Sequence, residues 1–333
     1  MELLIEHEQI LPTAPREIFE GESAGDYKRK WTSTFDLVFL IIMILILISN
    51  CVITSLIIPQ LWKEWKFWLK QMIIFSIMSV ALFIGGLICG HFCNIDKNGY
   101  IVTNKSSRFK VNYTRKLQHF VAHLLPVTFS GVLQTQIIIP ETLNLAWSYW
   151  FVLLVFLLLI KPIRERIRFM MLQFHSLDRP EDRPHTLFWI VVGNKLPGVL
   201  LTVFFRWLYP FTGQQRDLAY IFIFITSIGD GLAEPVGIYF GKHRYKTRGL
   251  CNNTLYERSY EGSACVFISS IVFTSTFWYA FTLPTQFWIA IIILPILMSF
   301  AEALSPHSCD TPFLHSVGGL TLFIISHINI QWI

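Results

Sequence analysis

The sequence has few charged residues for its length. Of its 333 residues, 15% are Asp, Glu, Lys or Arg and 53% are hydrophobic, and the mean hydropathy is +0.50. A soluble domain usually carries about 25% charged residues. This chain therefore has too little polar surface to be covered by water, which argues against a large soluble helical protein.

Patterns that bind structural metals are also scarce. The six cysteines form no CxxC pair. Cys89, His91 and Cys93 are close together in the sequence, but no second cluster accompanies them, so a zinc site is not predicted. The small net charge of +5 argues against nucleic-acid binding and agrees with basic loops that face an anionic lipid leaflet.

The N-terminal segment does not have the composition of a targeting peptide. Residues 1–34 are polar and acidic, whereas transit peptides are poor in acidic residues. The first apolar run, 35–58, is too long for the core of a signal peptide. We therefore expect a polar cytoplasmic tail over 1–34, followed by a retained transmembrane helix.

Long apolar runs are what the sequence does have. Several approach the roughly 20 residues that a helix needs to cross about 30 Å of hydrocarbon. They predict an all-α, polytopic membrane bundle of about nine transmembrane helices, at 35–58, 67–89, 118–139, 147–160, 187–208, 218–240, 263–283, 286–304 and 313–330.

The distribution of basic residues predicts the orientation. Of the 27 Lys and Arg, four, six, six and five lie in residues 1–34, 94–116, 161–186 and 241–262. The loops on the other side contain only Lys63, Lys66 and Arg216. Because basic loops stay in the cytoplasm, we expect a cytoplasmic N-terminus and a C-terminus on the opposite side, in a bacterial inner membrane or an endomembrane.

Two carboxylates near the end of the sixth run carry the strongest chemical signal. Asp230 and Glu234 are four residues apart, so on a helix they share one face. Two such carboxylates repel unless a cation lies between them, and Mg²⁺ usually takes one or two carboxylates together with substrate phosphate. The alternative is that Asp230 caps a helix break and pairs with an arginine.

Basic residues follow this pair. Lys242 and Arg244 lie where they could meet a phosphate chain, although a basic stretch at this position also fits an ordinary cytoplasmic loop. The sequence from Gly237 to Lys242 is not a P-loop, because its spacing is one residue short and His243 replaces Ser or Thr.

Three further clusters are expected on the same side of the membrane. Arg258, Ser259 and Glu261 open the seventh run, where a helix N-terminus could bind an anion or simply be capped. Glu302 lies within apolar sequence and must pair or bind something. The remaining candidate residues are Asp310, after the eighth run, and Arg115, Lys116 and His119, at the beginning of the third.

Taken in sequence order, the four clusters around Arg115, Asp230, Arg258 and Glu302 resemble the motifs of the polyprenol kinase family. This family includes phytol kinase, dolichol kinase and the CTP-dependent diacylglycerol kinase, and it is distantly similar to phosphatidate cytidylyltransferases. The resemblance covers about residues 115–325. The chain departs from the family pattern at Arg258, where Lys is typical, and at Thr311, where Asn is typical.

The resemblance implies a kinase-like catalytic domain over 115–333, preceded by two transmembrane helices and a basic loop over 35–114. It implies transfer of a γ-phosphate from CTP or ATP to an isoprenoid alcohol or diacylglycerol. Mg²⁺ would be held by Asp230, Glu234 and Asp310.

The remaining roles follow from the same resemblance. The catalytic residues would be Asp230, Glu234, Glu261, Glu302 and His119, the last as a proton acceptor. The nucleotide phosphates would be bound by Arg115, Lys116, Lys242, Arg244, Arg258 and Ser259.

Two other functions remain open from the sequence. A cytidylyltransferase would join CTP to a lipid phosphate and incorporate the nucleotide instead of the γ-phosphate. A transporter or lipid-binding scaffold would carry polar residues near the membrane midplane on several helices. The titratable residues here lie mostly near one end of the apolar runs, which favours an enzyme.

Overall fold

The computed structural model describes residues 33–96, 101–105, 109–133, 137–178, 182, 185–209, 215–250 and 255–329. The predicted N-terminal tail and the C-terminal end therefore lie outside the described residues, apart from a few at the tail's boundary. The first half contains α3 (Ser33–Ile57), η1 (Pro59–Lys63), α4 (Trp65–Phe92), β1 (Cys93–Ile95), β2 (Ile101–Asn104), α5 (Asn112–Thr128), α6 (Glu141–Val155), η2 (Phe156–Leu159), α7 (Lys161–Arg164) and α8 (Arg168–Leu177).

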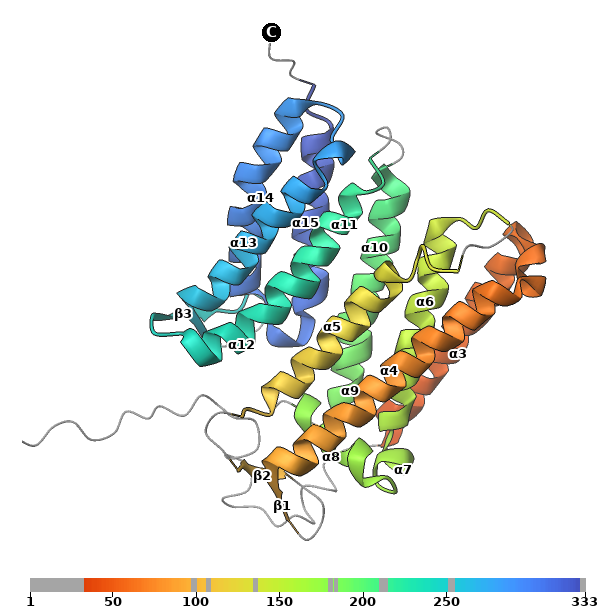
Figure 1. Ribbon diagram of the computed structural model, residues 1–333, viewed down its shortest axis with the longest axis vertical. Helices are drawn as coiled ribbons and strands as arrows, with labels where there is room; N and C mark the ends of the chain where they lie inside the picture. Colours follow the sequence, from red (N-terminus) through yellow and green to blue (C-terminus); the bar gives the residue numbers. More distant parts are fainter. Residues whose placement is uncertain are drawn as a thin grey trace, which may run out of the picture.

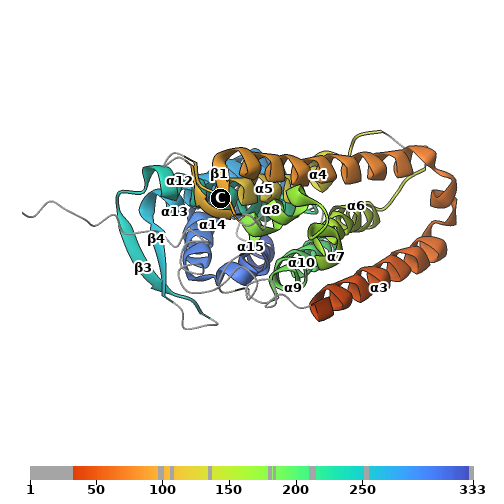
Figure 2. The same cartoon turned by 90° about the horizontal axis from the view of Figure 1, so that it is seen from below.

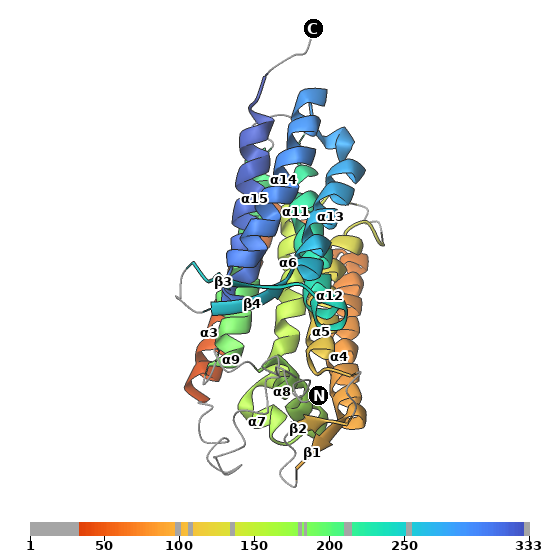
Figure 3. The same ribbon diagram turned by 90° about the vertical axis from the view of Figure 1, so that its left-hand side faces the viewer.

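The second half contains α9 (Thr186–Phe188), η4 (Trp189–Lys195), α10 (Leu196–Leu208), α11 (Leu218–Phe224), η6 (Ile225–Asp230), α12 (Gly231–Phe240), β3 (Arg244–Arg248), β4 (Leu255–Ser259), α13 (Tyr260–Thr276), η7 (Trp278–Ala280), α14 (Pro284–Leu304), η8 (His307–Cys309) and α15 (Asp310–Ser326). The long helices run roughly along one axis of the molecule (Figure 1, Figure 3).

The predicted all-α membrane bundle is confirmed. Six helices or helical successions in the described part of the chain are long and apolar enough to cross a membrane: Asp36–Ile57, Trp65–Phe92, Glu141–Leu159, Thr186–Leu208, Leu218–Phe240 and Pro284–Leu304. The other three apolar runs contain α5, α13 and α15, which have 17 residues each.

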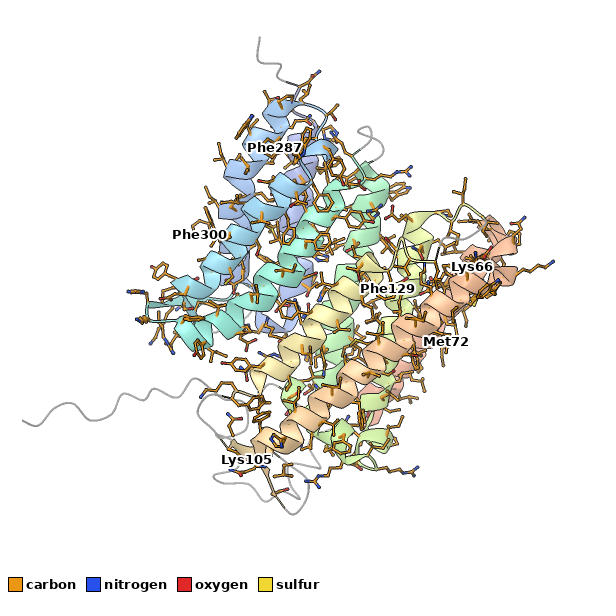
Figure 4. All side chains as sticks on the ribbon, viewed as in Figure 1. Lys66, Met72, Lys105, Phe129, Phe287 and Phe300 are labelled. Carbon is orange, nitrogen blue, oxygen red and sulfur yellow. The ribbon has the colours of Figure 1, made fainter. Side chains whose placement is uncertain are left out.

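The outside of the bundle is apolar over most of its height. Leu56, Ile292 and Phe300 are 79%, 63% and 62% exposed, although each belongs to a strongly apolar helix. Lys66 and Lys105 lie near the two ends of α4, and Phe300 lies on the opposite side of the molecule (Figure 4). Such a surface is stable in hydrocarbon and would be unfavourable in water.

Two hydrophobic cores meet inside the bundle. One lies among α3, α4, α6 and α8, and the other among α10, α11, α13, α14 and α15. Helices α5 and α6 contribute to both cores, with Ala122 and Trp147 in the first and Val127 and Tyr149 in the second. These two helices therefore hold the two groups together and position whatever lies between them.

Two short antiparallel hairpins lie toward the same end of the bundle. Strands β1 and β2 follow α4, and strands β3 and β4 connect α12 to α13 with Arg244 opposite Ser259. Seen from below, the β3–β4 hairpin lies at one edge of the molecule and α3 at the other (Figure 2).

Two of the long helical runs contain a π-helical segment. Segment η4 ends at Lys195 and segment η6 ends at Asp230, each inside apolar sequence. A π-helical turn adds a residue to the turn and redirects the side chains, and such turns are frequent at functional sites. Both segments thus place a charged residue at an irregular point of the backbone.

Close packing of α4 on α8 gives a test of the fold. A Cβ atom at Gly86 would overlap the backbone carbonyl oxygen of Phe169, whereas one at Gly90 would lie 3.5 Å from Leu172 Cδ1, an ordinary contact. We expect the overlap in Gly86→Ala to destabilise the protein by roughly 1–3 kcal/mol. The higher helix propensity of alanine should offset up to about 1 kcal/mol of this loss. Thermal unfolding in detergent should show a lower Tm for Gly86→Ala, with no decrease for Gly90→Ala. Equal effects of the two substitutions would contradict this packing.

Candidate functional site

The predicted carboxylate pair lies at the junction of η6 and α12. Asp230 is the last residue of η6 and is 4% exposed, while the side chain of Glu234, one helical turn later, is 23% exposed. Gly231 begins α12, where an added Cβ would lie 2.6 Å from the Phe120 ring. Because glycine has no Cβ, α5 can lie close to the backbone beside Asp230.

The N-terminal turn of α5 supplies the cations that face this pair. Lys116 Nζ lies 3.3 Å from Asp230 Oδ2 and 3.7 Å from Glu234 Oε2, so one ammonium group bridges both carboxylates. It also donates to the main-chain carbonyl of Asp230 at 3.0 Å. Arg115 pairs with Glu234 Oε1, which also accepts a hydrogen bond from Asn112. The cation expected between the carboxylates is thus provided by the protein itself.

His119 lies one turn further along α5. Its Nε2 is 3.0 Å from the Thr226 carbonyl, which can only accept, so this nitrogen carries the proton and Nδ1 keeps its lone pair. Nε2 is also 3.6 Å from Asp230 Oδ2. Nδ1 is 3.5 Å from Lys195 Nζ. Both ring nitrogens of His119 are therefore already engaged.

A second buried ion pair joins β4 to α14. Arg258 Nη1 donates to Glu302 Oε1 at 2.6 Å, and Glu302 Oε2 accepts a hydrogen bond from Ser263 at 3.3 Å. Glu302 is 3% exposed, and it lies close enough to Asp230 and Lys116 to interact with their charges. Arg258 likewise acts electrostatically on Asp230, so the two ion pairs belong to one cluster.

The beginning of α15 brings a further carboxylate to this cluster. Asp310 Oδ1 accepts hydrogen bonds from Asn194 at 2.8 Å and from the Thr311 amide at 2.7 Å. Asn194 Oδ1 in turn accepts from the same amide at 3.0 Å. Asp310 also interacts electrostatically with Asp230. The π-helical segment η4 and the first turn of α15 are thereby fixed to each other.

A polar pocket lies beside several of these groups, and we call it the outer pocket. Its lining includes Arg115, Lys116, His119, Asn194, Lys195 and Asp310. Within the described part of the chain, Arg115 Nε at this pocket and Arg258 Nε in the neighbouring ion pair are buried without a hydrogen-bond partner. Guanidinium donors of this kind suit an anionic, phosphate-like ligand, because each unused N–H can donate to it.

Lys242, Arg244 and Glu261 lie apart from this cluster, although Arg258 of the same hairpin belongs to it. Lys242 and Arg244 are exposed, and Arg244 Nη1 pairs with Glu257 Oε1 at 3.1 Å. Glu261 Oε1 accepts hydrogen bonds from the Lys242 amide at 3.1 Å and the His243 amide at 3.3 Å. Hydrogen bonding to its own amide, to His243 and to these two amides lowers the pKa of Glu261 to about 2.

Glu261 and Ser259 therefore hold the hairpin against α13 in this structure. Ser259 is the N-cap of α13 and accepts a hydrogen bond from the Gly262 amide at 3.0 Å. An N-cap of this kind stabilises a helix by about 1 kcal/mol. The nucleotide-binding and catalytic roles expected for the hairpin residues stay predictions.

The oxygen donors of the site fit the chemistry of a Mg²⁺ ion that also takes phosphate oxygens. Among the described residues, no group of three or more His, Cys, Asp or Glu side chains is arranged to hold a metal ion by itself. Asp230 and Asp310 nevertheless provide buried oxygen donors from different helices, and Mg²⁺ in nucleotide sites typically uses one or two carboxylates plus phosphate oxygens. Glu234 is occupied by Arg115, Lys116 and Asn112, so its role as a metal ligand stays a prediction.

Sequence reasoning missed several members of the site. Asn194 and Lys195 lie in the fifth apolar run, and a lysine within such a run is itself a signal of function. Asp182 accepts a hydrogen bond from Ser308 and lines the outer pocket. Nothing in the local sequence around Asp182 distinguishes it from an ordinary loop residue.

Comparison of the chain with models of protein families, with curated proteins and with solved structures finds no match.

Proposed function

We propose that this protein is a membrane lipid-alcohol kinase that transfers the γ-phosphate of a nucleoside triphosphate, CTP or ATP, to a lipid hydroxyl. The observation that carries the proposal is the outer pocket. Buried cations and carboxylates, with one unsatisfied guanidinium donor, line it from α5, η4 and α15, and the charged groups of η6, β4 and α14 interact with them. The chain that holds this pocket has helices that can span a membrane.

This set of groups suits phosphoryl transfer, which requires mainly positioning and charge neutralisation. Arg115, Lys116 and Arg258 would neutralise the phosphates, and Asp230 and Asp310 would hold Mg²⁺. When bound, the metal would neutralise phosphate charge. The lipid hydroxyl oxygen forms a bond to the γ-phosphorus, the bond from that phosphorus to the β–γ bridging oxygen breaks, and the nucleoside diphosphate leaves. The hydroxyl proton passes to a basic nitrogen of the site.

The proposal includes the topology. Nine crossings, with α5, α13 and α15 as the three short ones, would place the N-terminus and the basic loops on the cytoplasmic side. The outer pocket would then open toward the cytoplasm, where nucleotides are dissolved. A lipid would enter between helices at the depth of its head group.

The function can be tested by lipid profiling. We expect purified protein, incubated with mixed isoprenoid alcohols, diacylglycerol, Mg²⁺ and either CTP or ATP, to convert at least one alcohol to its monophosphate. Mass spectrometry of the extracted lipids identifies the product, and omission of Mg²⁺ should reduce its formation to background. No phosphorylated lipid with either nucleotide would contradict the proposal.

A further inference from the structure

A second pocket lies beyond Lys195, and we call it the inner pocket. Its lining includes His123, Tyr149, Lys195, Val199, Thr202 and His315, from α5, α6, η4, α10 and α15. Lys195 lines both pockets, and the neighbouring residues Asp310 and Thr311 line the outer and the inner pocket respectively. The two pockets therefore adjoin at Lys195.

Lys195 forms the boundary between the pockets with two histidines. Its Nζ lies 3.5 Å from His119 Nδ1, and 3.2 Å and 3.3 Å from His123 Nδ1 and Nε2. The Nδ1 atom of His123 is 2.9 Å from the His119 carbonyl and must donate to it, so His123 Nε2 keeps a lone pair. One ammonium group thus lies between the two imidazole rings, at the boundary of the outer and inner pockets.

His315, one of the side chains that line the inner pocket, has an unused acceptor. Its Nδ1 is 3.0 Å from the Gly198 carbonyl and must donate to it, so Nε2 carries the lone pair. His315 is 2% exposed, and its Nε2 has no hydrogen-bond partner among the described residues. A buried acceptor without a partner is unfavourable, and a ligand that donates an O–H group would satisfy it.

The other polar groups of the inner pocket distinguish between lipid classes. Thr202 Oγ1 donates to the Gly198 carbonyl at 2.9 Å, and Tyr149 OH donates to the His123 carbonyl at 3.5 Å. Both hydroxyl hydrogens are therefore committed to backbone carbonyls. Much of the remaining lining is apolar, with Val152, Leu153 and Val199. Two ester carbonyls would meet few donors here, whereas the carbon that bears a simple hydroxyl would contact apolar side chains.

We propose that the inner pocket binds the hydroxyl end of an alcohol whose O–H is attached directly to a hydrocarbon chain, such as an isoprenoid alcohol, in preference to diacylglycerol. His315 Nε2 accepts the hydrogen bond from this hydroxyl. As the bond from oxygen to the γ-phosphorus forms, the same nitrogen takes the proton, and the nucleoside diphosphate leaves on the side of Lys195. This inference rests on the kinase function proposed above.

Photolabelling tests the pocket without requiring turnover. The probe is a diazirine derivative of geranylgeraniol, added to the full-length protein in lipid nanodiscs without nucleotide. We expect it to attach to peptides of α6 and α10, with competition by geranylgeraniol and at least tenfold weaker competition by dioleoylglycerol. Val199→Trp should fill the pocket and abolish this labelling. Leu200→Trp, at a neighbouring residue that is 60% exposed, should leave it unchanged.

A second variant addresses the hydrogen bond itself. His315→Phe keeps a ring of similar size but removes the acceptor, and we expect about fivefold to tenfold weaker labelling, as expected for the loss of one hydrogen bond. In turnover assays it should raise the KM for the alcohol, lower kcat and remove the acidic limb of the pH profile. The KM for the nucleotide should stay unchanged. His327→Phe, at the exposed end of the same helix, is the control.

The outcomes separate the two proposals. Labelling confined to helices that do not line the inner pocket, labelling that persists in Val199→Trp, or equal competition by dioleoylglycerol would overturn the inner-pocket assignment. Pocket labelling by a protein that forms no lipid phosphate would contradict the kinase function and leave the binding site standing. Lipid phosphate formation with labelling elsewhere would contradict only the pocket.

Discussion

Replacing Asp230 with asparagine should lower kcat for lipid phosphorylation by a factor of about 10² to 10³, the range typical for loss of one electrostatic group in an active site. The substitution removes the negative charge but keeps the shape of the side chain. Lys116 Nζ would still donate to the main-chain carbonyl of residue 230 and would still face Glu234. We therefore expect the Tm of the variant to remain within a few degrees of that of the unmodified protein.

Steady-state kinetics and thermal unfolding together check this result. Asp217, at the other end of the same helical succession, is 3.3 Å from the Tyr279 hydroxyl and distant in sequence from the cluster. Asp217→Asn should leave kcat unchanged. Full activity of the Asp230 variant would remove this carboxylate from the site, and a collapse of its Tm would indicate a structural role instead.

Breaking the ion pair between Arg258 and Glu302 should have the largest effect on stability. Glu302 is 3% exposed and the side chain of Arg258 is 12% exposed, so Arg258→Met leaves a buried carboxylate without its main partner. Removing one member of a buried pair typically destabilises a protein by about 3–5 kcal/mol. We expect a clear loss of Tm and of the yield of folded protein.

The double variant separates stability from catalysis. Arg258→Met combined with Glu302→Gln removes both charges, so most of the lost stability should return, since replacing a whole buried pair is often close to neutral. Phosphorylation should stay absent because a cation that neutralises phosphate is missing. A stable and fully active double variant would show that the pair has only a structural role.

The sequence was informative where charge interrupts apolar runs. Asp230, Glu302 and Lys116 are conspicuous because a charge near hydrocarbon is unfavourable unless it is paired. The structure brings all three into one cluster. The helical class could be predicted for a similar reason, because the length of an apolar run and the thickness of a bilayer are directly related.

The sequence was less informative where tertiary contacts decide the role of a residue. In the sequence, Lys242 and Glu261 look like part of a phosphate site. In the structure, the Lys242 amide donates to Glu261 Oε1 beside the β3–β4 hairpin, outside the cluster. His315 resembles any histidine near the end of an apolar helix until the contact with the Gly198 carbonyl leaves its second nitrogen without a partner. Such facts depend on the register between α10 and α15, which local sequence patterns do not determine.

The most direct test of the kinase function is the fate of label from the nucleotide. The protein should be incubated in nanodiscs with an isoprenoid alcohol, Mg²⁺ and CTP that is labelled either at the γ-phosphate or at the α-phosphate, and the lipid fraction then extracted. If the protein is a lipid-alcohol kinase, γ-label appears in the lipid at one phosphate per product molecule and α-label stays in the aqueous phase. Transfer of α-label to the lipid would identify a cytidylyltransferase, and the absence of both labels, repeated with ATP, would contradict the account.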